Sequence, residues 1–244
     1  MTDNVTLALD GLAVPASIHK IFATHFQTHF TTYYNRRSDS VLNALCDKYG
    51  SDKGEITPDG HPYPWISHTY ADVLERLFGH CRDYVRYVFE CGLGTNNPSL
   101  ASSMGENGKP GASLRMWREY FPNAQIFGAD IDADILFQED RIATFACDQT
   151  DPQQVAALWA RLPDVEFDLF IDDGLHTYEA GVALFESAFH KVREGGIYII
   201  EDVTLESLIK FAKYFEGKSF AHEFVTLHRP NVPLGDNSQV IIRR

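Results

Sequence analysis

The sequence predicts a doubly wound α/β fold, in which helices cover both faces of a mostly parallel sheet. From residue 85 onward, short apolar runs alternate with amphipathic stretches, a pattern typical of parallel sheets with helical crossovers. The first 84 residues lack this alternation and favour helices. The composition, 44% apolar and 23% charged in 244 residues, fits one globular domain with an N-terminal extension.

Residues 1–84 are expected to form a mostly helical N-terminal cap. Apolar residues recur at helical spacing over 18–33, and 41–49 predicts a second helix that ends at Gly50, since glycine is favoured just past a helix. Three prolines within 58–64 exclude a helix interior and predict a loop over the surface or over a site.

Residues 85–244 are expected to form the doubly wound domain. Apolar runs predict five buried strands, over residues 87–91, 124–129, 142–147, 167–171 and 196–200. Amphipathic stretches predict the crossover helices, over residues 113–120, 151–162, 178–192 and 205–215. Two last strands, 222–228 and 239–243, have no helix between them and should pair antiparallel. The result is a Rossmann-like, seven-stranded sheet with one antiparallel strand.

Charge and sequence composition exclude several partner classes. With 21 Lys and Arg against 34 Asp and Glu, the net charge is −13, which repels nucleic-acid phosphates and anionic lipid. No apolar run approaches the length of a membrane-spanning helix. The N-terminus lacks the basic segment of a signal peptide, so a cytoplasmic location is expected. Four cysteines without a Cys-x-x-Cys pair indicate free thiols.

Ligands of open α/β sheets bind at the carboxyl ends of the strands, so the residues there are the candidate site. Glycines in the first such loop let the backbone approach a ligand, and carboxylate or amide groups there can accept or donate hydrogen bonds to a ribose and an adenine. The candidate cofactor residues on the first three strand ends are Glu90, Gly92, Gly94, Asp130, Asp148 and Gln149. Each also fits an ordinary turn or helix cap when taken alone.

The fourth and fifth strand ends carry two pairs of acids, Asp172 with Asp173 and Glu201 with Asp202. Like charges held close together repel unless a cation or protonation compensates, and an all-oxygen ligand set suits Mg²⁺, Ca²⁺ or Mn²⁺ rather than zinc. Either pair alone is also a plausible helix cap. Together they predict a divalent-metal site.

One histidine, His176, lies close in sequence to the candidate metal-binding acids and is the candidate general base. His176 follows the acids Asp172 and Asp173 on a loop, where an imidazole of ordinary pKa can accept a proton at neutral pH. His61 and His68, near the proline loop, are expected to be surface residues, with substrate contact as the alternative.

Several of these segments resemble known enzymes. Residues 90–94, 128–132 and 148–151 resemble the S-adenosylmethionine site of class I methyltransferases. Together with 48–54, 111–117, 171–176 and 200–202, they make the span from about 45 to 205 similar to the metal-dependent O-methyltransferases of macrolide sugars. Two features depart from the family pattern: Asn96 replaces a third glycine, and a long polar loop follows over 95–110.

The resemblance implies a role for each candidate residue. Asp130 would hold the ribose of S-adenosylmethionine, Asp148 would meet the adenine amine, and Asp172 would face the sulfonium. Glu90, Gly92 and Gly94 would lie beneath the methionine moiety. Mg²⁺ or another divalent cation would be held by Asp173, Glu201 and Asp202, and His176 would be the catalytic base.

The function implied is metal-assisted O-methylation of a sugar or of a glycosylated small molecule, with a glycan or nucleotide sugar also open as acceptor. An NAD-dependent oxidoreductase is an alternative, although Asn96 stands where that class needs a third glycine. A non-catalytic binding protein of the same fold is another. Aromatic residues over 22–34 suggest a homo-oligomer interface.

Overall fold

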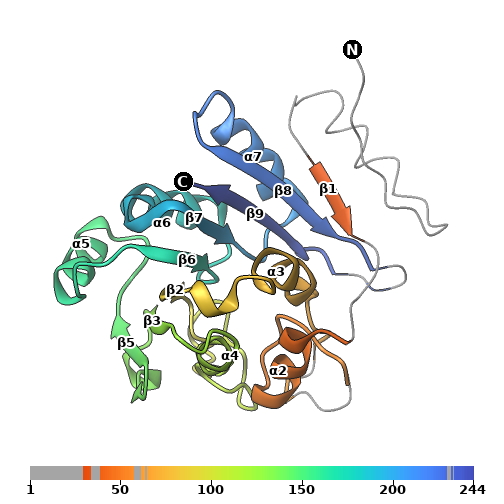
Figure 1. Ribbon diagram of the computed structural model, residues 1–244, viewed down its shortest axis with the longest axis vertical. Coiled ribbons are helices and arrows are strands. Elements are labelled where there is room, and N and C mark those ends of the chain that lie inside the picture. Colours follow the sequence, from red (N-terminus) through yellow and green to blue (C-terminus); the bar gives the residue numbers. More distant parts are fainter. Residues whose placement is uncertain (1–29, 34–38, 58–61, 64, 230–231, 233) are drawn as a thin grey trace.

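The computed structural model describes residues 30–33, 39–57, 62–63, 65–229, 232 and 234–244. Nine strands form one sheet in the order β1-β8-β9-β7-β6-β2-β3-β5-β4 (Figure 1). The strands are β1 (Phe30–Tyr33), β2 (Tyr87–Cys91), β3 (Gln125–Asp130), β4 (Gln138–Glu139), β5 (Ile142–Ala146), β6 (Phe167–Asp172), β7 (Val192–Ile200), β8 (Ala221–Leu227) and β9 (Ser238–Arg243).

The predicted α/β fold class is confirmed. All seven predicted strands are present, and among them only β9 is reversed, pairing antiparallel with both β7 and β8. Two short strands that the sequence did not indicate extend the edges: β4 pairs antiparallel with β5, and β1 pairs parallel with β8. The sheet therefore has nine strands rather than seven.

The helices are α2 (Val41–Tyr49), α3 (Tyr70–Phe78), α4 (Ala112–Tyr120), α5 (Pro152–Arg161), α6 (Tyr178–Ala188) and α7 (Leu205–Phe215), with short 3₁₀ turns at Arg82–Tyr84, Ala133–Ile135 and Phe189–Lys191. Helix α2 ends as predicted, because Gly50 adopts a left-handed conformation with φ of 78°. The helix predicted over 18–33 is wrong where it can be compared: Phe30–Tyr33 is a strand, and 18–29 lie outside the described residues.

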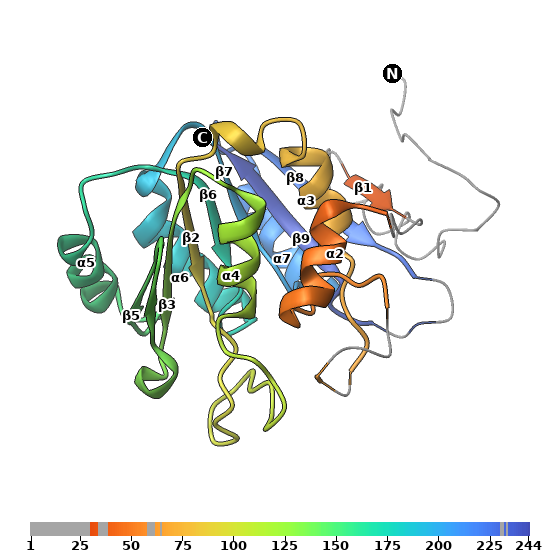
Figure 2. The same cartoon turned by 60° about the horizontal axis from the view of Figure 1, so that its bottom comes forward.

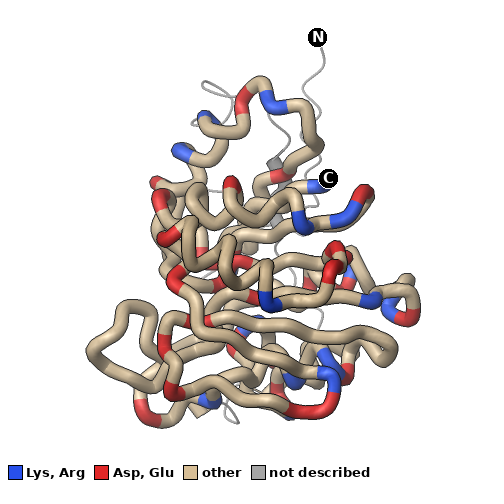
Figure 3. The backbone as a smooth tube through the Cα atoms, turned by 90° about the vertical axis from the view of Figure 1, so that its left-hand side faces the viewer, with Lys and Arg blue, Asp and Glu red and all other residues tan. Residues whose placement is uncertain are grey.

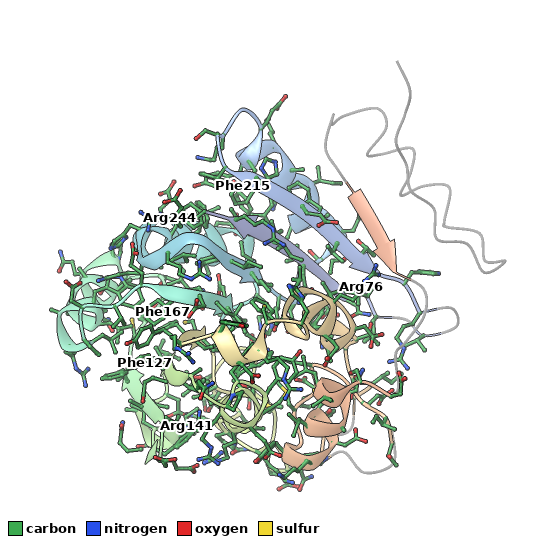
Figure 4. All side chains as sticks on the ribbon, in the orientation of Figure 1. Arg76, Phe127, Arg141, Phe167, Phe215 and Arg244 are labelled. Atoms are coloured by element: carbon green, nitrogen blue, oxygen red, sulfur yellow. The ribbon has the colours of Figure 1, made fainter. Side chains whose placement is uncertain are left out.

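Helices lie on both faces of the sheet (Figure 2), and a hydrophobic cluster fills the space between the sheet and the helices on each face. Alternate strand residues such as Val88 and Ile199 pack against α2, α3 and α4, whereas Phe89 and Tyr198 pack against α5, α6 and α7. On the second face Phe127 and Phe167, labelled in Figure 4, have ring centroids 6.0 Å apart. Helices α2 and α3 thus share one core with the sheet, and the boundary expected at residue 84 stays a prediction.

The four cysteines are free, as expected, and three of them are buried. Among the described residues, no helix is both long and apolar enough to span a bilayer. In Figure 3, acidic positions line much of the left-hand edge of the view, whereas acidic and basic positions are mixed on the right-hand side. The proline segment is only partly described, because 58–61 and 64, including His61, lie outside the described residues.

Candidate active site

Loops at the carboxyl ends of β2, β3, β5, β6 and β7 line a cavity of about 360 Å³. This is where a parallel α/β sheet binds its ligands, because the strand order reverses there and leaves a crevice. Of the eleven residues predicted for the site, eight line this cavity: Gly92, Gly94, Asp130, Asp148, Gln149, Asp173, His176 and Asp202. Glu90, Asp172 and Glu201 lie behind its wall.

The loop after β2 needs its two glycines. Gly92 and Gly94 have φ angles of 93° and 78°, in the left-handed region that other residues rarely adopt. A Cβ atom on Gly92 would lie 1.9 Å from the carbonyl oxygen of Asp173, and one on Gly94 would lie 2.2 Å from Sδ of Met104. The backbone is therefore open to a ligand and tightly packed against the β6 loop.

Asp130, at the end of β3, is held in place by backbone donors. Its two carboxylate oxygens accept hydrogen bonds from the amides of Leu93 (2.7 Å) and Asp132 (2.9 Å). Burial raises the pKa of Asp130, and these backbone donors oppose that rise. Each oxygen retains a lone pair, so this carboxylate can still accept the hydroxyl of a ligand.

Asp148 and Gln149 follow β5, and they differ in how far their polar atoms are already used by hydrogen bonds within the protein. Asp148 is partly exposed and accepts hydrogen bonds from the Thr150 amide and hydroxyl, at 2.8 and 2.7 Å. Gln149 uses both ends of its amide within the protein: Nε2 donates to Asp172 Oδ1 (2.9 Å), and Oε1 accepts from the Leu175 amide (2.8 Å). Gln149 thus ties the β5 loop to the β6 loop.

Two of the predicted cofactor residues are buried behind the wall. Glu90 is 0% exposed and accepts hydrogen bonds from Ser113 Oγ (2.6 Å) and from Nε1 of Trp117. Asp172 lines a second, much smaller cavity of about 10 Å³, and its Oδ2 has no hydrogen-bond partner among the residues that the structure describes. Burial raises the pKa of Asp172 to about 6.

Asp173, Asp202 and His176 form a convergent group on the cavity wall. One ligand atom from each lies within 4.8 Å of the others. His176 Nε2 is 3.3 Å from Asp173 Oδ1 and 3.2 Å from Asp202 Oδ2. His176 and Asp202 have φ angles of 57° and 53°, which cost backbone free energy in non-glycine residues and are often found at functional sites.

The electrostatics of this group fit a cation. Burial lowers the pKa of His176, but the carboxylates of Asp202 and Asp173 outweigh burial and raise it to about 10. With these three groups alone, the imidazole would be protonated at neutral pH. A divalent cation shared by the two carboxylates would offset their charge, and their oxygens are the ligands that Mg²⁺ prefers.

Glu201 is oriented differently from its neighbour Asp202. Its side chain is 0% exposed; Oε2 accepts a hydrogen bond from Lys53 Nζ and Oε1 accepts one from Gln239 Nε2 at 2.8 Å. Burial raises the pKa of Glu201 to about 8. The convergent group therefore contains two of the three predicted metal ligands, together with His176 in place of Glu201.

The prediction that His68 lies at the surface is wrong, and Tyr70 is a site residue that the sequence did not indicate. His68, expected at the surface, is 7% exposed and lines the cavity, with Nε2 3.4 Å from Asp202 Oδ1 and 3.3 Å from Asp236 Oδ1. Tyr70, at the start of α3, lies with its hydroxyl 2.7 Å from Asp202 Oδ1. Both residues belong to a segment of the N-terminal half that has no strand pattern, so neither of them follows a predicted strand.

The long polar loop over 95–110 covers one side of the cavity. Thr95, Ser102 and Met104 line it, and Ser102 Oγ lies 3.5 Å from His176 Nδ1. Asn96 donates a hydrogen bond from Nδ2 to the carbonyl oxygen of Gly108 at 3.0 Å. At the place of a third glycine, Asn96 therefore organises this loop.

Comparison with known proteins finds sugar-modifying methyltransferases, although no family model matches the chain. Demethylmacrocin O-methyltransferase of Streptomyces fradiae is 33% identical over 186 residues, 75% of this chain and 44% of that protein. An 8-demethyl-8-alpha-L-rhamnosyl tetracenomycin-C 2'-O-methyltransferase of Streptomyces olivaceus is 32% identical over 66% of this chain and 37% of that protein. The chain thus spans less than half the length of the curated relatives it matches.

Solved structures agree with these relatives. MycE methyltransferase from the mycinamycin biosynthetic pathway, in complex with Mg and SAH, superposes with a TM-score of 0.57 at 25% identity, covering 84% of this chain and 54% of that one. The resemblance seen in the sequence motifs is confirmed by these relatives and by the shared fold.

Proposed function

The chain is a relative of the sugar O-methyltransferases, and from this relationship we propose that it transfers a methyl group from S-adenosylmethionine to a hydroxyl of a sugar or of a glycosylated small molecule. One observation carries the proposal. Two glycines with a ribose-type acceptor, Asp130, and a carboxylate group with a histidine, His176, line one and the same cavity.

The cofactor side consists of Gly92, Gly94, Asp130 and Asp148. The two glycines leave backbone space for the methionine part, Asp130 accepts the ribose hydroxyls, and Asp148 accepts the adenine amine. Glu90 and Asp172 support this side from behind the wall, and Gln149, which lines the cavity, is hydrogen-bonded to Asp172.

On the acceptor side, Asp173 and Asp202 would hold Mg²⁺ or another divalent cation, with Glu201 as the third predicted ligand. The bound cation would act as a Lewis acid that lowers the pKa of an acceptor hydroxyl. Tyr70 and His68 fix the orientation of Asp202 through its Oδ1 oxygen, which leaves Oδ2 facing His176.

His176 takes the proton of the acceptor hydroxyl at Nε2 while the oxygen attacks the methyl carbon. The new C–O bond forms as the C–S bond breaks, and its electron pair passes to sulfur. The imidazolium that results is stabilised by Asp173 and Asp202, at 3.3 and 3.2 Å. Loop residues Ser102 and Met104 form part of the cavity wall beside this group.

Methyl transfer from labelled S-adenosylmethionine to a panel of glycosides and nucleotide sugars tests this proposal. We expect a glycoside to be labelled in the presence of Mg²⁺, with loss of labelling after EDTA and recovery when Mg²⁺ is restored. Failure to bind S-adenosylhomocysteine in calorimetry would contradict the proposal independently of the acceptor panel. A homo-oligomer and a cytoplasmic location stay predictions.

A further inference from the structure

Lys53 is a buried cation that takes no part in the proposed reaction as described so far. The residue is 2% exposed and lies in the segment between α2 and α3. Its carbonyl oxygen accepts a hydrogen bond from the Ala71 amide at 2.8 Å, and that of Asp52 accepts one from the His68 amide at 2.8 Å. The backbone of Lys53 is thus fixed to the segment that carries His68 and Tyr70.

The ammonium of Lys53 contacts three acids from three strand ends. Nζ lies 2.6 Å from Asp173 Oδ2, 3.4 Å from Glu90 Oε1 and in contact with Glu201 Oε2. Glu90 and Glu201 have fully buried side chains. Two hydrogen bonds, to Asp173 and Glu201, and the ion pair with Glu90 hold the ammonium at the edge of the main cavity, which Lys53 also lines.

These contacts determine how Asp173 is presented to the cavity. One of its oxygens, Oδ2, is held by Lys53, and the other, Oδ1, faces His176. Buried charges are costly unless they are paired. Without the ammonium of Lys53, the carboxyl groups of Glu90, Glu201 and Asp173 would lie close together with no positive charge between them.

Resting on the proposed function, we propose that Lys53 is the positioning residue of the acidic site. It acts as an internal counter-ion that neutralises Glu90 and Glu201 and holds Asp173 with Oδ1 turned to the cavity. Lys53 thereby sets both the orientation of the carboxylate and the net charge that a divalent cation meets there.

Removing the positive charge of Lys53 should change cation binding and turnover in opposite directions. The Lys53→Met substitution would leave the cluster one unit more negative, which favours a divalent cation by Coulomb attraction. The same substitution would release Asp173, which weakens the alignment of the acceptor hydroxyl. A merely structural contact would instead lower cation affinity and turnover together.

Mn²⁺ titration followed by electron paramagnetic resonance tests this directly on the full chain, with folding checked by circular dichroism. We expect K53M to bind Mn²⁺ about three- to tenfold more tightly than the wild type. The K48M variant is the matched control, since Lys48 pairs with Glu119 at the surface with its side chain 53% exposed; its Mn²⁺ affinity should not change. Turnover of K53M on a labelled acceptor should fall by about tenfold or more at an acceptor KM close to that of the wild type.

Glu90→Gln removes one negative charge from the cluster and leaves Lys53 in place. E90Q should weaken Mn²⁺ binding by about three- to tenfold, and the double variant K53M/E90Q, with the net charge of the wild type, should return to within about twofold of it. Weaker Mn²⁺ binding by folded K53M, or tighter binding by E90Q, would overturn the proposed role of Lys53. Absence of Mn²⁺ binding by the wild type would instead count against the proposed function, on which the role of Lys53 rests.

Discussion

Gly92 joins two loops of the site, because its backbone packs against the carbonyl of Asp173 where a side chain has no room. We predict that Gly92→Ala lowers the free energy of unfolding by roughly 2–4 kcal/mol, since a Cβ atom would clash with backbone and the φ of 93° is strained in alanine. Urea unfolding measures this change. Gly105→Ala is the control: Gly105 has a φ of 68° and open space around it, so its substitution should cost only about 1 kcal/mol.

The base and the cation site can be separated by substitution. Removing the imidazole with His176→Ala should lower turnover by roughly 10²–10⁴, because proton abstraction is its proposed task. Binding of S-adenosylhomocysteine, measured by calorimetry, should stay close to that of the wild type. Asp173→Asn should instead weaken Mn²⁺ binding; equal loss of turnover and of nucleoside binding in His176→Ala would argue that the imidazole is structural.

At the scale of single residues, the sequence predicted which acids gather at the strand ends but not which way each one faces. Successive residues of a strand point to opposite faces of the sheet. Glu90 and Glu201 therefore lie on the face of α2 and α4, where Lys53 pairs with them, and Asp172 lies on the face of α6. Asp173 and Asp202, beyond the strand ends, reach the cavity. Lys53 itself follows no strand, so no periodic pattern indicated it.

At the scale of elements, helix α6 begins directly after the site loop that carries His176. Its first turn is capped by Thr177, whose hydroxyl accepts a hydrogen bond from the Ala180 amide at 3.2 Å. We predict that Thr177→Ala lowers the free energy of unfolding by about 1 kcal/mol, as measured by thermal or urea unfolding. Thr177→Ser retains the capping oxygen and should be close to the wild type. A variant T177A as stable as T177S would show that the cap contributes nothing.

The elements that the sequence predicted correctly are those whose pattern is local. Strands β2, β3, β5, β6 and β7 each contain a short apolar run, and α4 to α7 are amphipathic, so each could be assigned from its own residues. Strand β1 was mistaken for a helix because its structure depends on pairing with β8, near the other end of the chain. Contacts between distant segments leave no periodicity in either segment.

At the scale of the whole molecule, the nucleoside-type residues and the convergent acids come from different strand ends around one cavity. Asp130 and Asp148 follow β3 and β5, whereas Asp173 and Asp202 follow β6 and β7. No residue is shared between the two proposed sets, although Gly92 touches the backbone of Asp173. The two ligands should therefore bind largely independently, with S-adenosylhomocysteine binding in the absence of metal.

Thermal unfolding in four conditions measures this independence. A ligand at about 100 times its Kd stabilises the folded state by about 2.7 kcal/mol, which for a chain of this size corresponds to a Tm increase of roughly 5–10 °C. We expect S-adenosylhomocysteine to raise Tm equally with EDTA and with Mg²⁺, and Mg²⁺ to add its own increase. Asp130→Ala should lose most of the Tm increase caused by S-adenosylhomocysteine, since a hydrogen bond to a charged group contributes about 1.5–3 kcal/mol. The Tm increase caused by Mg²⁺ should be unchanged in this variant. An increase with S-adenosylhomocysteine that disappears in EDTA would mean that cation and nucleoside form one joint site, because binding of either would then require the other.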